Sequence, residues 1–253
     1  MKITFLGTGT SQGVPVITCE CDVCRSKNPK DQRLRSSVLI EHQGKTFVID
    51  TGPDFRQQML REDVKHIDFV LLTHEHKDHT AGLDDIRAFN HSQKENINVY
   101  ANKRTCSAVR SEFAYAFCED KYPGVPEINL CEINNKAFEA KNIHIQPLDI
   151  IHFKLPVLGF RIDRMAYITD ANAIPEHEIP KLLDLDLLII NALGNKHHYS
   201  HFNLTEALEV VECIKPKQSF FTHISHVMGL HDQVNKNLPP YAQLAYDGLT
   251  IEL

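Results

Sequence analysis

The sequence predicts an α/β fold in which helices cover the outer faces of buried β-sheets. Short apolar runs bounded by turn-forming residues recur along the chain, which is typical of buried strands. Stretches with apolar residues at helical spacing lie between these runs. The alternation of the two patterns indicates an α/β architecture with helices outside the sheets.

Six runs are predicted to be strands, and most end beside a polar residue that can bind a metal ion. In chain order they comprise residues 2–6, 46–49, 67–72, 143–151, 165–169 and 219–222. The second, fourth, fifth and sixth stop one residue before Asp50, His152, Asp170 and His223. The third runs toward a histidine cluster that begins at His74.

Three stretches are predicted to be helices: residues 80–90, 104–118 and 203–214. The last has a clear start signal, because Asn203 is a good N-cap and Glu206 follows three residues later, as in a capping box. Residues 119–130, which include Pro123 and Pro126, are predicted to form an ordered loop.

Length and composition are those of an ordinary globular protein, and we expect one domain over residues 1–253. The chain has 253 residues, 42% hydrophobic and 24% charged, with a formal charge of -6. A net negative charge disfavours nucleic acid as a partner. No apolar run approaches the roughly 20 residues of a membrane span, and the N-terminal segment is too short for a signal peptide. We therefore expect a cytoplasmic protein without membrane contact.

The segment His74-Glu75-His76-Lys77-Asp78-His79 offers metal ligands in two pairs. In an extended backbone His74 and His76 point the same way, because side chains alternate. Asp78 and His79 follow about one turn later and can face a neighbouring point. Imidazole and carboxylate together suit Zn, Mn or Fe. A solvated charged loop is the alternative interpretation, but three histidines and an aspartate directly after an apolar strand favour a metal site.

This motif resembles that of the metallo-β-lactamase superfamily. The resemblance implies an αββα sandwich with two mixed sheets and a dinuclear site at the strand ends. It also implies the remaining ligands: His152 for the first metal, Asp170 as a bridge, and His223 for the second metal, with Asp50 supporting the ligand loop. Two divalent ions, Zn or Mn, would then generate a bridging hydroxide as the nucleophile.

Cys19, Cys21 and Cys24 place three thiols in one short loop. Thiolates are soft ligands that select zinc, and a closed tetrahedral set is typical of structural zinc sites. The alternative is a set of free thiols or a redox pair. We expect His226 as the fourth ligand, since it lies three residues beyond His223. Such a thiol cluster also favours a reducing compartment over a disulfide framework.

The cysteine triplet narrows the resemblance to the phosphoribosyl 1,2-cyclic phosphate phosphodiesterase branch of the carbon–phosphorus lyase pathway. The segment from Thr8 to Pro15 and the terminal Thr222-His223-x-x-His226 are also similar to that group. A pyrroloquinoline quinone biosynthesis protein carries a similar triplet, so the triplet alone does not decide between them. The branch suggests a homodimer.

A phosphodiester's leaving oxygen needs a proton, and in this branch a histidine from another loop supplies it. His201 matches that position, and we assign catalytic roles to His201 as general acid and to Asp78 within the metal-binding motif. His197 and His198 are nearby competitors, and His231 receives no role. Imidazole suits proton transfer near neutral pH.

The sequence identifies the substrate-binding residues less specifically than the metal ligands. The aromatic stretch around Tyr115 and Tyr122 is predicted to form one wall of the pocket, although helical spacing favours core packing for most of its rings. Arg33 and Arg35 could meet a substrate phosphate, or lie on an exposed strand face.

The sequence therefore predicts a dinuclear phosphodiesterase acting on a small or cyclic phosphodiester. The alternatives are RNA processing of the tRNase Z type, thioester or lactam hydrolysis, and a non-hydrolytic role in cofactor biosynthesis. No basic tRNA-binding insertion is evident in the sequence, which disfavours RNA processing. The set of histidine and aspartate ligands is complete, which disfavours a non-hydrolytic role.

Overall fold

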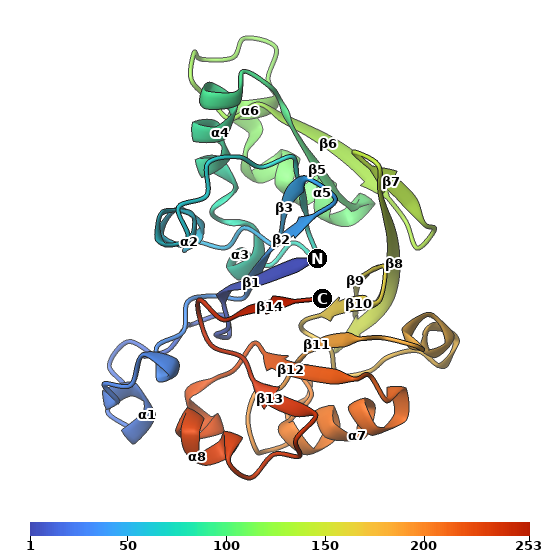
Figure 1. Cartoon of the computed structure of the whole chain (residues 1–253). Helices are drawn as coiled ribbons and strands as arrows, with labels where there is room; N and C mark the ends of the chain where they lie inside the picture. Colours follow the sequence, from blue (N-terminus) through green and yellow to red (C-terminus); the bar gives the residue numbers. More distant parts are fainter.

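The computed structural model describes residues 1–253 as two seven-stranded sheets that pack face to face, with helices outside (Figure 1). The first sheet has the order β14 (Thr250–Glu252), β1 (Lys2–Gly7), β2 (Ser37–His42), β3 (Lys45–Ile49), β4 (Phe69–Leu71), β5 (Ile97–Asn102) and β6 (Ile128–Ile133). The second has the order β13 (Ala242–Leu244), β12 (Gln218–Thr222), β11 (Leu187–Asn191), β10 (Met165–Ile168), β9 (Leu155–Ile162), β8 (Ile143–His152) and β7 (Phe138–Ala140).

Helices lie on the outer face of each sheet. The first sheet is covered by α2 (Phe55–Arg61), α4 (Arg87–Gln93), α5 (Lys103–Glu112) and α6 (Ala114–Phe117), and the second by α7 (Leu204–Ile214) and α8 (His231–Asn235). The short helices α1 (Asp22–Arg25) and α3 (Lys77–Thr80) belong to loops, as do the 3-10 turns η1 (Pro29–Asp31), η2 (Leu83–Ile86), η3 (Glu176–Leu182) and η4 (His226–Met228).

Three apolar clusters hold these layers together. The central one fills the space between the sheets and includes the buried rings of Phe5, Phe47, Phe69, Phe160 and Tyr167. The other two lie between each sheet and its helices. Burial of apolar area is the main favourable term in folding, so this arrangement explains why both faces of each sheet are apolar. The αββα sandwich is confirmed.

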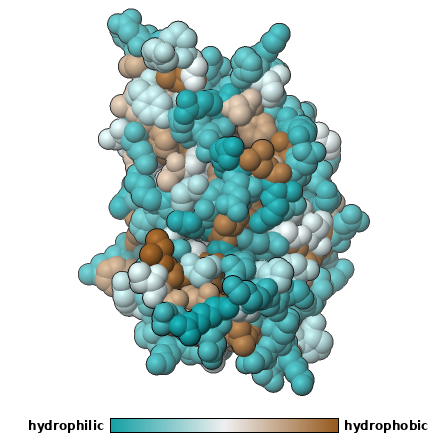
Figure 2. Space-filling view, turned by 90° about the vertical axis from the view of Figure 1, so that its left-hand side faces the viewer, coloured by the Kyte–Doolittle hydropathy of each residue, from teal (hydrophilic) through white to brown (hydrophobic).

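The outer surface carries few large apolar residues. On the face shown in Figure 2, most of the surface is hydrophilic and the hydrophobic residues form small separate patches. None of the helices combines the length and apolar character needed to cross a membrane.

The prediction of one helix over residues 80–90 is wrong, because this stretch is not continuous. The chain instead forms α3, then η2, then α4. The break occurs where Gly82 lies against the backbone of Gly52: a Cβ atom on Gly82 would stand 2.1 Å from the Gly52 carbonyl oxygen. This close approach, together with a hydrogen bond of 2.9 Å from Gly82 N to Thr51 O, interrupts the helical path.

Two other boundaries also differ from the prediction. The helix expected over 104–118 is interrupted at Phe113, where φ is -103° and ψ is 37°, so that α5 and α6 are separate. The loop expected over 119–130 ends earlier, because β6 begins at Ile128. The capping box at Asn203 and Glu206 is confirmed, with both reciprocal hydrogen bonds at 2.9 Å.

The strand directions bring the predicted ligands together. The strands β3, β4 and β5 are parallel, as are β10, β11 and β12, and β8 has the same direction as β10 because both are antiparallel to β9. The segments that follow β3, β4, β8, β10 and β12 therefore meet at one end of the sandwich.

Candidate metal centres

The first candidate metal centre comprises His74, His76 and His152, whose ligand atoms lie within 4.8 Å of one another. His74 follows Thr73 at the end of β4, and its Nδ1 lies 3.0 Å from Thr73 Oγ1. Since the Thr73 hydroxyl donates to a carboxylate, it accepts from His74 Nδ1, which leaves Nε2 free for a metal. His152 Nδ1 donates to the carbonyl oxygen of Ser200 at 2.8 Å, and again leaves Nε2 free.

The second candidate centre comprises Asp78, His79, Asp170 and His223, also within 4.8 Å. His79 Nδ1 donates to Asp50 Oδ2 at 2.7 Å, and His79 Nε2 lies 3.1 Å from oxygens of both Asp78 and Asp170. Such a carboxylate behind a metal-binding imidazole fixes its orientation and tautomer. Asp50 was predicted to support the ligand loop, and its hydrogen bond with His79 is such a contact.

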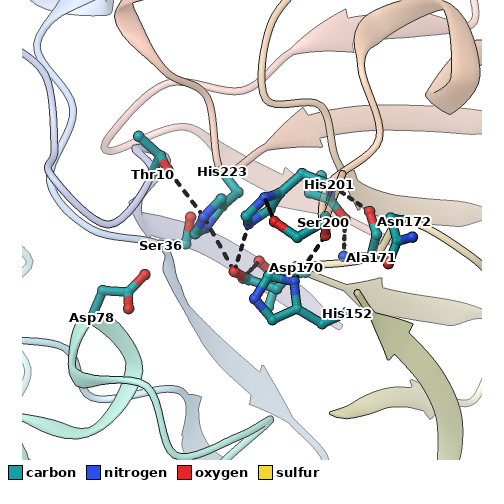
Figure 3. Close-up of polar contacts among 12 residues, drawn as sticks. Thr10, Ser36, Asp78, His152, Asp170, Ala171, Asn172, Ser200, His201 and His223 are labelled. Atoms are coloured by element: carbon teal, nitrogen blue, oxygen red, sulfur yellow. Dashed lines mark hydrogen bonds and ion pairs between the residues drawn. The ribbon is translucent and has the colours of Figure 1, made fainter. Parts of the chain in front are cut away.

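Asp170 is common to the two halves of the site. It also forms a group with His152 and His201, so it lies between the first and the second centre. Figure 3 shows His152, His201 and His223 gathered around Asp170, with Asp78 approaching from α3. His201 Nε2 lies 3.0 Å from Asp170 Oδ1, and His223 Nε2 lies 3.3 Å from the same oxygen.

The buried histidines fit metal ions because two of their nitrogens make no hydrogen bond. Nε2 of His74 is buried without a partner, and the buried Nε2 of His79 makes no hydrogen bond although oxygens of Asp78 and Asp170 lie 3.1 Å away. An unsatisfied buried polar atom costs about 1–3 kcal/mol, which coordination would offset. Burial, with the charge of His79 next, holds the pKa of His74 well below its usual value, which favours the neutral form of imidazole that can bind a metal.

The charge balance of the second centre also fits a cation. Burial would lower the pKa of His79, but the charges of Asp78, Asp170 and Asp50 outweigh it and raise this pKa well above its usual value. Burial would likewise raise the pKa of Asp170, but His223 and His79 hold it well below its usual range. Asp78 and Asp170, both with lowered pKa values, are thus ionised, and a cation beside them would be stabilised.

Three residues of this site have left-handed backbone: Asp50 at φ 66°, Asp170 at φ 55° and His223 at φ 54°. Each comes one or two residues after the end of a strand. This conformation costs about 1–3 kcal/mol for a residue other than glycine and is found preferentially at functional sites. The turn it produces directs each side chain across the strand ends.

The predicted zinc ligands converge at a separate place. Cys19, Cys21, Cys24 and His226 bring their ligand atoms within 4.8 Å of one another. His226 Nδ1 lies 3.2 Å from Cys19 Sγ and 3.4 Å from Cys21 Sγ. A hydrogen bond from the Cys24 backbone and the contact with His226 lower the pKa of Cys21 to about 6, toward the thiolate that binds zinc. Three thiols and one imidazole suit a closed tetrahedral site.

The aromatic residues proposed as a pocket wall make no hydrogen bond, ion pair or ring contact with the metal-binding side chains. Tyr115 donates to Asp84, and Tyr122 is 80% exposed. Their segment, with Gly124 and Val125, instead borders a surface hollow of about 620 Å³ shared with α4. Their contact with substrate stays a prediction.

Both alternatives considered for Arg33 are wrong. Arg33 is only 4% exposed, and its Nη1 donates to Thr8 Oγ1 at 2.8 Å and to the Ala245 carbonyl at 2.6 Å. Arg35 donates two hydrogen bonds to Asp54, at 2.9 and 3.0 Å. Arg33 therefore links Thr8, near the N-terminus, to Ala245, near the C-terminus, inside the fold. No pattern in the sequence indicates this role.

The sequence analysis missed the threonines that precede the ligands. Thr73, Thr169 and Thr222 each stand directly before a predicted ligand at the end of a buried strand, and all three are buried. Thr169 Oγ1 donates to Asp170 Oδ2 at 2.7 Å. The recurrence of threonine before a histidine or aspartate at strand ends was the available signal.

Taken together, a sandwich with histidines and aspartates at the strand ends defines a metal-binding α/β protein of the hydrolase type. Residues 45–224 match the family model described as a Beta-lactamase superfamily domain. The chain is also 38% identical to a diphosphatase from the PhnP family whose crystal structure superposes with a TM-score of 0.93, covering 99% of this chain and 96% of that one. The protein belongs to the metallo-β-lactamase superfamily, in its PhnP-like branch.

Two curated relatives carry other names. An octanoyltransferase of Porphyromonas gingivalis is 40% identical over 252 residues, which are 98% of this chain and 51% of the relative. A ribonuclease Z of Prochlorococcus marinus is 28% identical over 172 residues, which are 64% of this chain and 49% of the relative. These alignments span about half the length of each curated relative.

Proposed function

We propose that the protein is a phosphodiesterase that hydrolyses a small or cyclic phosphodiester, with His201 as the general acid. The observation that carries this proposal is the position of His201 beside Asp170, at 3.0 Å, where the two candidate metal centres meet. Two divalent ions in these centres, Zn or Mn, would neutralise the phosphoryl oxygens and acidify water. The similarity to a diphosphatase favours attack at phosphorus.

The surroundings of His201 suit a proton donor. Its Nδ1 lies 2.9 Å from Ser200 Oγ and 3.2 Å from His198 Nδ1, which hold the ring in place. Its side chain is partly open to solvent, at 12% exposure, so the proton can be replaced after each turnover. His197 pairs instead with Glu206 of the capping box and is turned toward solvent, which makes it a weaker candidate.

The test is His201→Ala in protein reconstituted with Zn or Mn. We expect kcat on an unactivated alkyl diester to fall by roughly 10²–10⁴, because general acid catalysis contributes about that much. The loss on bis-p-nitrophenyl phosphate should be smaller, since its leaving group departs without a proton. His197→Ala is the matched control and should retain activity. Full activity of His201→Ala on the alkyl diester would exclude this residue from the mechanism.

A second candidate is thioester hydrolysis, favoured by the octanoyltransferase name of the relative that aligns with 98% of this chain. Because the alignment spans 51% of that relative, its named activity can belong to its other half. Turnover of an octanoyl thioester without turnover of any phosphodiester would favour this candidate.

RNA processing is less well supported. The ribonuclease Z alignment covers 64% of the chain, and the charge of -6 disfavours a polyanionic substrate. Cleavage of a precursor tRNA is the assay that would favour it. Three closely spaced thiols support a reducing compartment as the place of action, and we therefore propose the cytoplasm.

A further inference from the structure

Two large aromatic side chains are exposed beside the candidate metal centres. Phe153 is 52% exposed and Tyr199 is 66% exposed, and their rings meet edge to face with centroids 5.5 Å apart. The His198 ring stacks on Tyr199 at 4.4 Å and 27°. Exposed aromatic rings that contact one another leave apolar faces in water, which is unfavourable unless something covers them. We call Phe153, His198 and Tyr199 the aromatic platform.

The aromatic platform is continuous with the reacting centre. Phe153 directly follows His152, which belongs to the first centre. The ring of His198 lies 5.2 Å from the ring of His201, and the ring of His201 lies 4.7 Å from that of His152. A substrate whose phosphorus lies near His201 would therefore have its non-reacting half within reach of the platform.

The position of Phe153 is fixed by the same segment that carries Asp170. Its backbone is left-handed, at φ 58°, which is unfavourable for a bulky residue. The Phe153 N–H donates to Asn172 Oδ1 at 2.5 Å, and Asn172 N donates to Ile151 O at 2.9 Å. The two-residue turn between β8 and β9 thus holds an exposed phenyl ring beside His152 of the first candidate centre.

A cation accompanies the rings. Lys154 Nζ lies 5.2 Å from the centre of the Phe153 ring. A molecule that combines a flat aromatic ring with a further anionic group would meet complementary chemistry on both sides, since aromatic rings stack on π-faces and lysine attracts phosphate.

We propose that the aromatic platform binds a planar ring in the non-reacting half of the substrate, such as a nucleobase. This inference rests on the proposed function, and it narrows the substrate class to nucleotide-like phosphodiesters. Phe153 and Tyr199 would then be specificity residues that act on binding, while His201 acts on the reaction itself.

The kinetic test compares two cyclic diesters that differ only in the base: adenosine 2′,3′-cyclic phosphate and methyl riboside 2′,3′-cyclic phosphate. The wild-type enzyme, loaded with Zn or Mn, should prefer the first. This preference, measured as a ratio of kcat/KM values, should fall about 10-fold in Tyr199→Ala and in Phe153→Ala. The variant Tyr199→Phe keeps the aromatic ring and should retain the preference. Tyr241→Ala, at a distant exposed tyrosine, is the matched control. An unchanged ratio in both alanine variants would overturn the proposal.

A binding test separates this proposal from the proposed function. The chain contains no tryptophan, so Tyr199→Trp introduces a single fluorophore. Adenosine 5′-monophosphate should quench it by stacking, and ribose 5-phosphate should not. Tyr122→Trp serves as the reporter at the other aromatic segment and should not respond. Quenching confined to Tyr122→Trp, or seen with neither reporter, refutes the platform. Quenching at Tyr199→Trp without hydrolysis of either diester supports the platform and refutes the phosphodiesterase.

Discussion

His231 should make the folded protein sensitive to mild acid. It begins α8 and is 1% exposed. Its Nδ1 accepts a hydrogen bond from the Arg33 guanidinium at 3.1 Å, so the ring cannot take a proton there without losing that bond. Burial lowers the pKa of His231 to about 4, with further lowering by Arg33 and Lys30, while Asp232 and Asp31 act in the opposite direction.

The magnitude follows from proton linkage. Between the usual pKa of about 6.5 and the folded pKa of about 4, the unfolded chain binds a proton at His231 that the folded protein does not bind. The free energy of unfolding therefore falls as pH falls through this window. At pH 5 the distance from 6.5 is about 1.5 pH units, and at 1.36 kcal/mol per unit the loss attributable to His231 is about 2 kcal/mol.

The assay is denaturant unfolding of zinc-loaded protein at pH 7.5 and pH 5. In His231→Gln the glutamine oxygen can accept the Arg33 hydrogen bond but does not titrate. The loss of unfolding free energy between the two pH values should therefore be smaller in His231→Gln by about 2 kcal/mol. His144→Gln, at an exposed histidine of β8, is the control and should behave like the wild type. Equal losses in His231→Gln and wild type would refute the reasoning.

Three further predictions concern residues that support the fold and the candidate metal centres. Asp50→Asn should weaken metal binding at the second candidate centre about 10- to 100-fold, because it removes the carboxylate behind His79; chelator competition measures this, and unchanged affinity would contradict it. Cys21→Ser should remove one zinc per chain by elemental analysis and lower Tm, whereas retention of every ion would argue against a thiolate site. Asn203→Ala should lower the free energy of unfolding by about 1 kcal/mol in denaturant titrations, and no change would mean that the capping box adds nothing.

Local spacing explains what could be predicted from the sequence. The hexapeptide from His74 to His79 has its ligands at fixed short offsets, and the start of α7 depends only on Asn203 and Glu206. The strand ends at Asp170 and His223 were evident because an apolar run stops one residue earlier. These features depend on neighbouring residues, so tertiary contacts do not alter them.

The remaining features depend on contacts between distant segments. The strand β11 was not predicted, although its residues Leu187–Asn191 are all buried. Arg33 is buried because Ala245 and His231, near the other end of the chain, satisfy its donors. The break near Gly82 arises from its packing against Gly52, which no local pattern encodes. The aromatic platform likewise exists only because β8 and the loop before α7 converge.

The segment from His223 to His226 supplies one residue to the second candidate centre and one to the candidate zinc site. Ile224 N donates to Thr8 O at 2.8 Å and Ser225 N donates to Leu193 O at 3.0 Å, so this short stretch is tied down on both sides. Oxidants such as peroxide react with thiols of low pKa such as Cys21, and loss of Cys21 as a ligand would remove one contact of His226, the third tie of this stretch. The same segment presents His223, so we expect hydrolysis to decline with thiol oxidation although no cysteine belongs to the first or second candidate centre.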